Sequence, residues 1–234
     1  MSTFSLVIPC YNEALTLPAL IDRLCACFAN TQGYEIVLVN NGSTDNSAEA
    51  LSQAAAEHPF IRIVDVPVNQ GYGWGILQGL AAAKGDYLGW THADMQTDPG
   101  DAIEAFAKLR LQNAPLTFVK GRRYGRPLAD VLFTVGMSCF DSALFGMPLW
   151  DINAQPTVFS RAFYNMWQDP PKDFALDLYV YAMARKAGAR IARFPVLFAK
   201  RQHGTSHWNI NWKAKLKFIK RTIDFSFALK RTWK

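Results

Sequence analysis

The first hundred residues alternate between short apolar runs and segments whose apolar residues recur at helical spacing. Continuous apolar runs predict strands at residues 4–9, 35–39, 61–66 and 86–91. The segments between them predict helices at residues 14–28, 44–57 and 71–83. Apolar runs without polar alternation are typical of parallel strands that are covered on both faces. The pattern therefore predicts an α/β fold with a mostly parallel central sheet flanked by helices.

From about residue 100 the alternation is less regular. Helices are predicted at residues 101–112, 130–145 and 174–187, and strands at 116–120 and 190–196. A basic turn is predicted at 120–126, and an irregular or short-strand region at 147–159. No linker-like stretch or internal repeat divides the chain. We expect one domain over residues 1–208, made of halves 1–98 and 99–208, followed by a basic amphipathic helix within 209–234.

The composition is that of a globular protein with a substantial core. Of 234 residues, 50% are hydrophobic and 19% are charged, which excludes disordered, collagen-like and coiled-coil chains. No run of about eighteen apolar residues is found, so no transmembrane helix is expected. The start of the chain lacks a basic region typical of a secretory signal. The four cysteines have no metal-binding spacing, which favours a reducing, cytoplasmic compartment.

Positive charge is concentrated at the C-terminal end. Residues 200–234 contain ten Lys or Arg and one acid, whereas residues 1–199 contain fifteen basic and eighteen acidic residues. This asymmetry indicates an anionic partner for the tail, either a membrane surface or nucleic acid, and the alternative is a solvated helix face. A nucleic-acid-binding function would explain the tail but none of the polar clusters described below.

The tail is predicted to form a basic amphipathic helix over residues 212–230. One face gathers the basic residues Lys213, Lys217, Lys220 and Arg221. One apolar stripe is Trp212, Leu216, Ile219, Ile223 and Phe227, and a second is Phe218, Phe225 and Leu229. Helices of this type bind membrane interfaces, although a last helix packed on the domain shows a similar pattern. We expect one stripe to pack on the protein and the other to be available to lipid.

Polar residues follow four of the predicted strands. These clusters are residues 11–13, 40–43, 69–71 and 92–94. In parallel sheets the ligand lies beyond the carboxyl ends of the strands. Asp94 and Gln96 could both face a divalent cation that bridges two phosphates, because Mg²⁺ and Mn²⁺ prefer carboxylate and amide oxygens. The alternative for this segment is an ordinary polar loop in which Asp98-Pro99 begins a helix.

The glycines at 71–75 do not form a dinucleotide fingerprint, because that motif follows the first strand of the fold. They are better explained by close approach of the backbone to a ligand or to a neighbouring strand.

These motifs, in this order, resemble glycosyltransferase family 2, the inverting enzymes with the GT-A fold. The resemblance runs through residues 7–13, 39–45, 69–75, 85–86, 94–99, 151–161, 174–177, 195–196 and 201–206. The second half is most similar to the subgroup that glycosylates polyprenyl phosphates. The resemblance implies a nucleotide-diphosphate-sugar donor, a lipid-linked phosphate acceptor and a Mg²⁺ or Mn²⁺ cofactor. It also implies a peripheral position at the cytoplasmic face of a membrane.

The resemblance also implies roles for individual residues. The nucleotide-sugar site would comprise Pro9, Tyr11, Glu13, Asn40, Gly71, His92 and Asp94. The metal would be held by Asp94, Gln96 and His203. The acceptor phosphate would be bound by Arg122, Arg123 and Arg126. Arg201 would close over the donor diphosphate, and Asp177 and then Asp151 are the candidates for a catalytic base.

Three positions depart from the family pattern. His92 replaces the first acid of the usual Asp-x-Asp motif, Asn40 replaces an acid that contacts the base, and Tyr179 stands where Glu is frequent. An anionic lipid phosphate needs no strong base, whereas a sugar hydroxyl would need one such as Asp177. The alternatives are a soluble or polysaccharide hydroxyl acceptor, or a non-catalytic subunit that binds nucleotide sugars.

Overall fold

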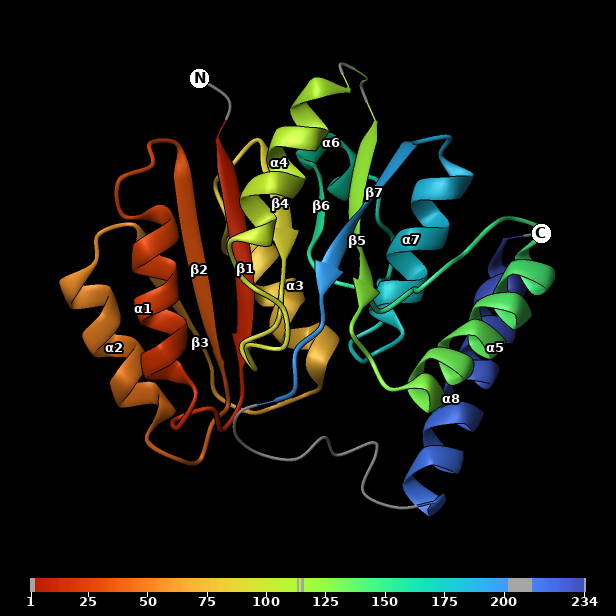
Figure 1. Ribbon diagram of the computed structural model, residues 1–234, viewed down its shortest axis with the longest axis horizontal. Helices are drawn as coiled ribbons and strands as arrows, with labels where there is room; N and C mark the ends of the chain where they lie inside the picture. The colour runs from red at the N-terminus through yellow and green to blue at the C-terminus, as the bar shows by residue number, and fades with distance from the viewer. Residues whose placement is uncertain (1–2, 113, 115, 202–211, 234) are drawn as a thin grey trace.

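The computed structural model describes residues 3–112, 114, 116–201 and 212–233, with a seven-stranded sheet at the centre (Figure 1). The strand order is β3-β2-β1-β4-β6-β5-β7. Strands β1 (Phe4–Cys10), β2 (Tyr34–Asn41), β3 (Ile61–Val66) and β4 (Tyr87–Trp90) pair in parallel. The predicted mostly parallel sheet is therefore confirmed. The carboxyl ends of these four strands meet at one edge of the sheet.

Helices cover both faces of the sheet (Figure 1). One face packs against α1 (Leu17–Phe28), α2 (Ser47–Glu57) and α4 (Asp101–Leu111). The other packs against α3 (Tyr72–Ala82), α6 (Arg161–Tyr164) and α7 (Leu176–Lys186). Along β1, Leu6 and Ile8 enter the first core and Val7 enters the second. This two-sided burial explains why the strands are apolar at every position.

The second half of the sheet is mixed. Strand β6 (Thr157–Ser160) pairs antiparallel with both β4 and β5 (Thr117–Tyr124). Strand β7 (Arg190–Leu197) then pairs with β5 in parallel along its whole length. The predicted basic turn at 120–126 is wrong, because β5 continues through Arg122 and Arg123 while hydrogen-bonded to β7. The basic residues are carried by a strand that a distant segment stabilises.

Helices α5 (Leu128–Phe145) and α8 (Trp212–Thr232) lie side by side at the far end of the sheet, beyond α7 (Figure 1). The ring centroids of Phe140 and Phe227 are 5.9 Å apart, and those of Phe145 and Trp233 are 5.3 Å apart. The Ser226 hydroxyl donates to Asp141 Oδ1 at 2.7 Å. The two helices therefore run in the same direction and are joined by both apolar and polar contacts.

Helix α5 corrects one expectation from the sequence. It is long and apolar enough, by length and composition, to cross a membrane, although no such helix was expected. Small polar residues interrupt its apolar run, so the sequence shows no unbroken stretch of eighteen apolar residues. The mean hydropathy of the helix is nevertheless high enough for a membrane-spanning helix. Few of its residues are buried, so its position on the surface bears on function.

Candidate active site

The loops that follow β1 and β2 are tied together by side-chain hydrogen bonds. The Asn12 backbone N–H donates to Ser43 Oγ at 3.2 Å, and the Thr44 N–H donates to Asn12 Oδ1 at 2.8 Å. Asn12 has a φ of 54°, a left-handed conformation that Asn adopts more readily than most residues. The Ala14 N–H donates to Asp45 Oδ2 at 3.1 Å. Much of the polar cluster after β2 therefore builds the edge of the site and holds its shape.

Asn40 lies at the carboxyl end of β2, beside an acid that the sequence analysis did not single out. Its Nδ2 donates to Asp65 Oδ1 at 3.0 Å, and its Oδ1 accepts from the Ser43 N–H at 3.2 Å. Asp65 is opposite Asn40 in the β2–β3 register. A carboxylate therefore lies beside Asn40, and the neighbouring strand contributes it. The position of Asp65 in the predicted third strand could have indicated it as a partner of Asn40, but only if the register of β2 and β3 had been known.

Asp94 lies in the loop after β4 and is buried. Its Oδ2 accepts from Arg201 Nη2 at 2.5 Å, and its Oδ1 accepts from the Gln96 N–H at 3.1 Å. Gln96 also donates from Nε2 to the Ala199 carbonyl at 3.2 Å. The segment after β7 is thereby brought across to the end of β4. Burial raises the pKa of the nearby Glu13 carboxyl. The charge of Arg201 opposes this shift, and the charge of Asp94 adds to it.

Few protein side chains at this site could ligate a metal ion. No cluster of three or more His, Cys, Asp or Glu side chains suited to a metal ion is found in the part of the chain that the structure describes. His203, predicted as a metal ligand, lies outside the described residues. One carboxylate from Asp94 nevertheless fits a Mg²⁺-type ion, because such ions are bound through one or two carboxylates together with substrate phosphates.

His92 is part of an aromatic stack and is only partly exposed. Its ring stacks on Tyr72 at 5.3 Å, and Tyr72 stacks on Phe174 at 4.8 Å between ring centroids. Burial lowers the pKa of His92, which favours the neutral ring, although the charges of Asp94 and Asp177 oppose the shift. The Tyr72 hydroxyl is 3.3 Å from His92 Nε2 and accepts from Gln155 Nε2 at 3.2 Å. A polar chain therefore leads from the end of β4 toward α7.

This chain ends on Asp177, in the first turn of α7. Asp177 Oδ1 accepts from Gln155 Nε2 at 2.9 Å and from Lys120 Nζ at 3.2 Å. The side chains of Lys120 and Asp177 are 0% and 3% exposed. Burial lowers the pKa of Lys120 to about 8, although the Asp177 charge opposes that shift. Neither Lys120 nor Gln155 was assigned a role from the sequence: Lys120 was placed in the predicted basic turn at 120–126, and Gln155 in the irregular region at 147–159.

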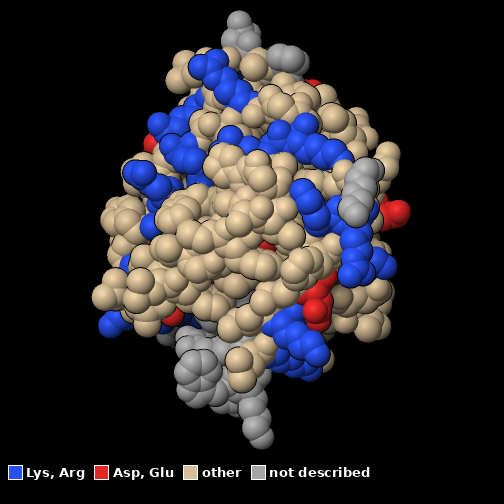
Figure 2. All heavy atoms as spheres, turned by 90° about the vertical axis from the view of Figure 1, so that its right-hand side faces the viewer, with Lys and Arg blue, Asp and Glu red and all other residues tan. Residues whose placement is uncertain are grey.

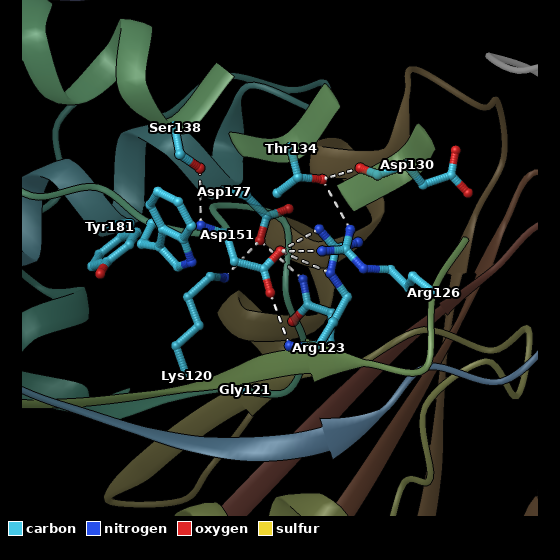
Figure 3. Close-up of polar contacts among 12 residues, drawn as sticks. Lys120, Gly121, Arg123, Arg126, Asp130, Thr134, Ser138, Asp151, Asp177 and Tyr181 are labelled. Atoms are coloured by element: carbon cyan, nitrogen blue, oxygen red, sulfur yellow. Dashed lines mark hydrogen bonds and ion pairs between the residues drawn. The ribbon is translucent and has the colours of Figure 1, made fainter. Parts of the chain in front are cut away.

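Asp151 is surrounded by arginines (Figure 3). Its carboxylate accepts from the Arg123 N–H and Nε at 2.9 Å each, and it lies 3.7 Å from Arg126 Nη2 and 3.9 Å from Arg193 Nη2. Burial would raise the pKa of Asp151, but Arg123 and Arg126 hold it below the usual value. An ionised carboxylate committed to arginines is a poor proton acceptor. The geometry therefore favours a counter-ion role for Asp151 over the predicted role as a base.

The arginines line a pocket of about 350 Å³ at the start of α5. Among its described lining residues, three are arginines and one is an aspartate: Arg122, Arg123, Arg126 and Asp151. Arg122 is exposed and Arg126 is almost fully buried. Arginine forks match the geometry of phosphate oxygens. The structure thus brings together the three arginines that the sequence analysis assigned to the acceptor.

The remaining predicted donor residues lie at the ends of β1 and α3. Pro9 is in β1, and Tyr11 is exposed just beyond it. Gly71 has a φ of 119°, and a Cβ there would lie 2.7 Å from the Lys172 carbonyl oxygen. Close packing on the segment before α7 therefore explains this glycine without a ligand.

The sequence profile described as Glycosyl transferase family 2 matches residues 5–166, which is more than half of the chain. Undecaprenyl-phosphate 4-deoxy-4-formamido-L-arabinose transferases of Yersinia pestis and Yersinia pseudotuberculosis are 47% identical to the chain over 98 residues. That match spans 41% of this chain and 30% of the length of those relatives.

Solved structures share the fold. Glucosyl-3-phosphoglycerate synthase from Mycobacterium tuberculosis, in complex with phosphoglyceric acid, has a TM-score of 0.74 at 17% identity, covering 98% of this chain and 80% of that one. A mannosyltransferase from Pyrobaculum calidifontis, in complex with GDP-Man and Mn²⁺, has a TM-score of 0.66 at 20% identity, covering 87% of this chain and 58% of that one. The predicted GT-A fold is thereby confirmed.

Proposed function

The chain belongs to glycosyltransferase family 2, and on this premise we propose that it transfers a sugar, with inversion, from a nucleotide-diphosphate sugar to a polyprenyl phosphate or another lipid-linked phosphate. The assignment of a phosphate acceptor rests on the arginine-lined pocket at the start of α5. The Yersinia relatives, named as undecaprenyl-phosphate transferases, support the same acceptor class.

In the proposed reaction, an anionic oxygen of the acceptor phosphate forms a bond to the anomeric carbon. The bond from that carbon to the β-phosphate oxygen breaks, and its electron pair leaves on the nucleoside diphosphate. Arg201 stabilises the charge that grows on the leaving group, since it already lies at the end of β4. Arg122, Arg123 and Arg126 orient the acceptor phosphate. No side chain has to accept a proton from an acceptor that is already ionised.

A divalent cation is part of this proposal. Asp94 would hold it, with Gln96 and His203 as further candidates, and the donor diphosphate would supply other oxygens. When bound, Mg²⁺ or Mn²⁺ would neutralise charge on the diphosphate. The Pyrobaculum mannosyltransferase was solved with Mn²⁺ and a nucleotide sugar, which supports the assignment of a divalent cation. Asp94 would exchange its contact with Arg201 for the cation when the donor binds.

The second candidate acceptor is a soluble or polysaccharide hydroxyl. It is favoured by one observation, the Asp177 carboxylate at the end of the polar chain from His92. In that case Asp177 would accept the hydroxyl proton. Lys120 and Gln155 both donate to Oδ1 of Asp177, so they would hold the carboxylate in position.

We also infer that the enzyme works at a membrane surface on the cytoplasmic side. Residues 1–208 would form the catalytic domain, and the basic helix within 209–234 would dock on anionic lipid. Lys217, Lys220 and Arg221 are exposed on α8, while Leu229 is buried against the protein. Cations near an anionic surface contribute about 1 kcal/mol each. No nucleic-acid partner is proposed.

The donor site is tested by calorimetric binding of UDP, GDP, dTDP and CDP with Mn²⁺ and then with EDTA. We expect one nucleotide to bind tightly and only with metal. Asp94→Asn should abolish the metal dependence, whereas the matched Asp98→Asn should not, because Asp98 pairs with Arg23 on the surface. If Asp94→Asn still bound that nucleotide much more tightly with Mn²⁺ than with EDTA, as the wild type does, the role of Asp94 would be refuted.

The acceptor is tested by transfer assays with a polyprenyl phosphate and with the matching polyprenol. We expect transfer to the phosphate only. Arg122→Ala should raise the KM for the phosphate roughly tenfold or more, because a charge-assisted hydrogen bond contributes about 1.5–3 kcal/mol. Arg110→Ala, on the exposed side of α4, is the control. Transfer to a sugar hydroxyl that is lost in Asp177→Asn would favour the second candidate.

A further inference from the structure

We propose that α5, and not only the basic helix α8, contacts lipid: its outer face lies in the headgroup layer of an anionic membrane. The inference deepens the proposed function, because the membrane would be the one that carries the lipid-linked acceptor. It rests on the surface of the fold, however, and vesicle binding can be measured without any transfer reaction.

The outer face of α5 is apolar along its whole length. Leu128 and Leu132 are 73% and 61% exposed. Cys139 and Ala143 are also exposed, about two and three helical turns beyond Leu132 on the same face. At Gly136, between them, a Cβ would meet nothing within 4 Å. None of these outward positions carries a charge, which is unusual for a solvent-exposed helix face.

The inner face of α5 argues against a helix that crosses the membrane. Ser138, Asp141 and Phe145 are buried against the protein. Ser138 Oγ accepts from the Asp151 N–H at 3.1 Å, and Asp141 accepts from Ser226. A spanning orientation would expose these polar groups to hydrocarbon, where they have no partners. A helix with one apolar face and one protein-bound face lies in the plane of the interface.

The surface around α5 is suited to anionic headgroups. Figure 2 shows a broad uncharged area with Lys and Arg around it and few acids. Helix α8, which packs beside α5, carries the exposed cations Lys217, Lys220 and Arg231. Phe227, which is 44% exposed, contacts Phe140 of α5 and so extends the apolar area onto α8.

Aromatic residues complete the rim at the N-terminal end of α5. Tyr124 and Trp150 are both about half exposed there, and Tyr and Trp prefer the level of the headgroups. A second copy of the chain is disfavoured as the occupant, because a two-fold contact would place one cationic rim against the other. Anionic lipid complements both the apolar area and its cations.

This arrangement would set the depth of the arginine-lined pocket. Val131, Thr134 and Val135 of α5 line that pocket together with Trp150. If the outer face of α5 lies among the headgroups, the pocket opens at the level where a lipid phosphate is found. The acceptor would then reach Arg122 and Arg126 without leaving the membrane.

The test is flotation of the full chain with vesicles of phosphatidylcholine containing phosphatidylglycerol. We expect the double variant L128Q/L132Q to lower the partition onto vesicles by about tenfold or more, because two large exposed apolar side chains are lost. The matched control is Leu111→Gln, a leucine that is 84% exposed at the end of α4. Equal partition of L128Q/L132Q and L111Q would overturn the proposal.

A second measurement uses Cys139, which is exposed on the outer face. An environment-sensitive dye on Cys139, in a C25S/C27S background, should shift to the blue and be quenched by brominated lipid. An unchanged spectrum on addition of vesicles would refute insertion of α5. A dimer in sedimentation that L128Q/L132Q abolishes would show instead that a second copy covers this face.

The two proposals can fail separately. L128Q/L132Q should keep nucleotide binding and transfer to a detergent-solubilised acceptor, since neither leucine lines the pocket. Loss of vesicle binding with that activity retained supports the docking face. Vesicle binding without transfer to any lipid phosphate would refute the proposed acceptor and leave the docking face standing.

Discussion

Replacement of the buried Asp141 in α5 should remove a pH-dependent loss of stability. Asp141 is 1% exposed, and burial raises the pKa of its carboxyl to about 6 from 3.8, although its hydrogen bond with Ser226 opposes the shift. The unfolded chain releases this proton at lower pH than the folded chain does. The stability of the protein therefore falls as pH rises from about 4 to about 6, and the loss is complete above that range.

The magnitude follows from the two pKa values. Their difference corresponds to about 3 kcal/mol, of which about 1.4 kcal/mol is lost between pH 5 and pH 8. Asp141→Asn removes the titration and keeps an oxygen for the Ser226 hydroxyl. Its amide Nδ2 would stand where Asp141 Oδ2 is buried without a hydrogen-bond partner, which costs about 1–3 kcal/mol at every pH. The pH-independent cost and the pH-dependent gain can therefore be separated.

The assay is urea unfolding of wild type and Asp141→Asn at pH 5 and at pH 8. We expect the variant to improve relative to wild type by about 1.4 kcal/mol between the two pH values. Groups that titrate in both proteins cancel in this comparison. Asp224→Asn, on the exposed side of α8, is the control and should show little relative change. An identical difference between wild type and Asp141→Asn at both pH values would refute the reasoning.

Three further predictions concern the candidate active site. Lys120→Met should destabilise the fold by about 3–5 kcal/mol in urea unfolding at pH 7, because Asp177 would stay buried without its cation. The double variant Lys120→Met, Asp177→Leu should recover part of this loss. A double variant no more stable than Lys120→Met alone would argue against this cause. Tyr72→Phe keeps the ring stack but breaks the polar chain from His92 to Asp177, so with a hydroxyl acceptor it should reduce kcat with little change in melting temperature. An unchanged kcat for that acceptor would contradict a role for the chain. Asp65→Asn should weaken binding of the preferred nucleoside diphosphate about tenfold or more and leave pyrophosphate binding unchanged in calorimetry; equal loss for both ligands would place Asp65 outside base recognition.

The part of the fold that local pattern determines was predicted well. Strands β1 to β4 were located from apolar runs, and each lies within about two residues of its predicted position. Helix α1 begins at Leu17 and not near residue 14, since residues 13–16 form a hydrogen-bonded turn before it. Helix ends depend on single hydrogen bonds, which periodicity does not report.

The errors in the second half have a common origin in long-range pairing. Residues 120–126 read as a turn because they are basic and contain two glycines, yet β5 runs to Tyr124 because β7, some 70 residues later, supplies its hydrogen bonds. The exposed apolar face of α5 was also not predicted. Its apolar character was evident, but only the structure shows which face packs on the protein and which is exposed.

Candidate site residues were predicted where a polar residue follows an apolar strand, as for Asp94 and Asn40. Their partners were not. The bond from Asn40 to Asp65 depends on the register of β2 and β3. The contact from Asp94 to Arg201 joins residues 107 positions apart. The sequence suggested Asp151 as a possible base, and only the structure brings Arg123, Arg126 and Arg193 to its carboxylate, which favours a counter-ion role.

The sequence by itself determined the α/β class, the order of the first four strands along the chain and the edge at which the polar clusters meet. These follow from local periodicity and from the rule that parallel strands end at one edge. Tertiary structure alone decided the partners of the charged groups: Lys120 with Asp177, and Arg123 with Asp151. The reason is physical, because a charge acquires its chemistry from the groups within a few ångströms, and folding brings those groups from distant parts of the chain.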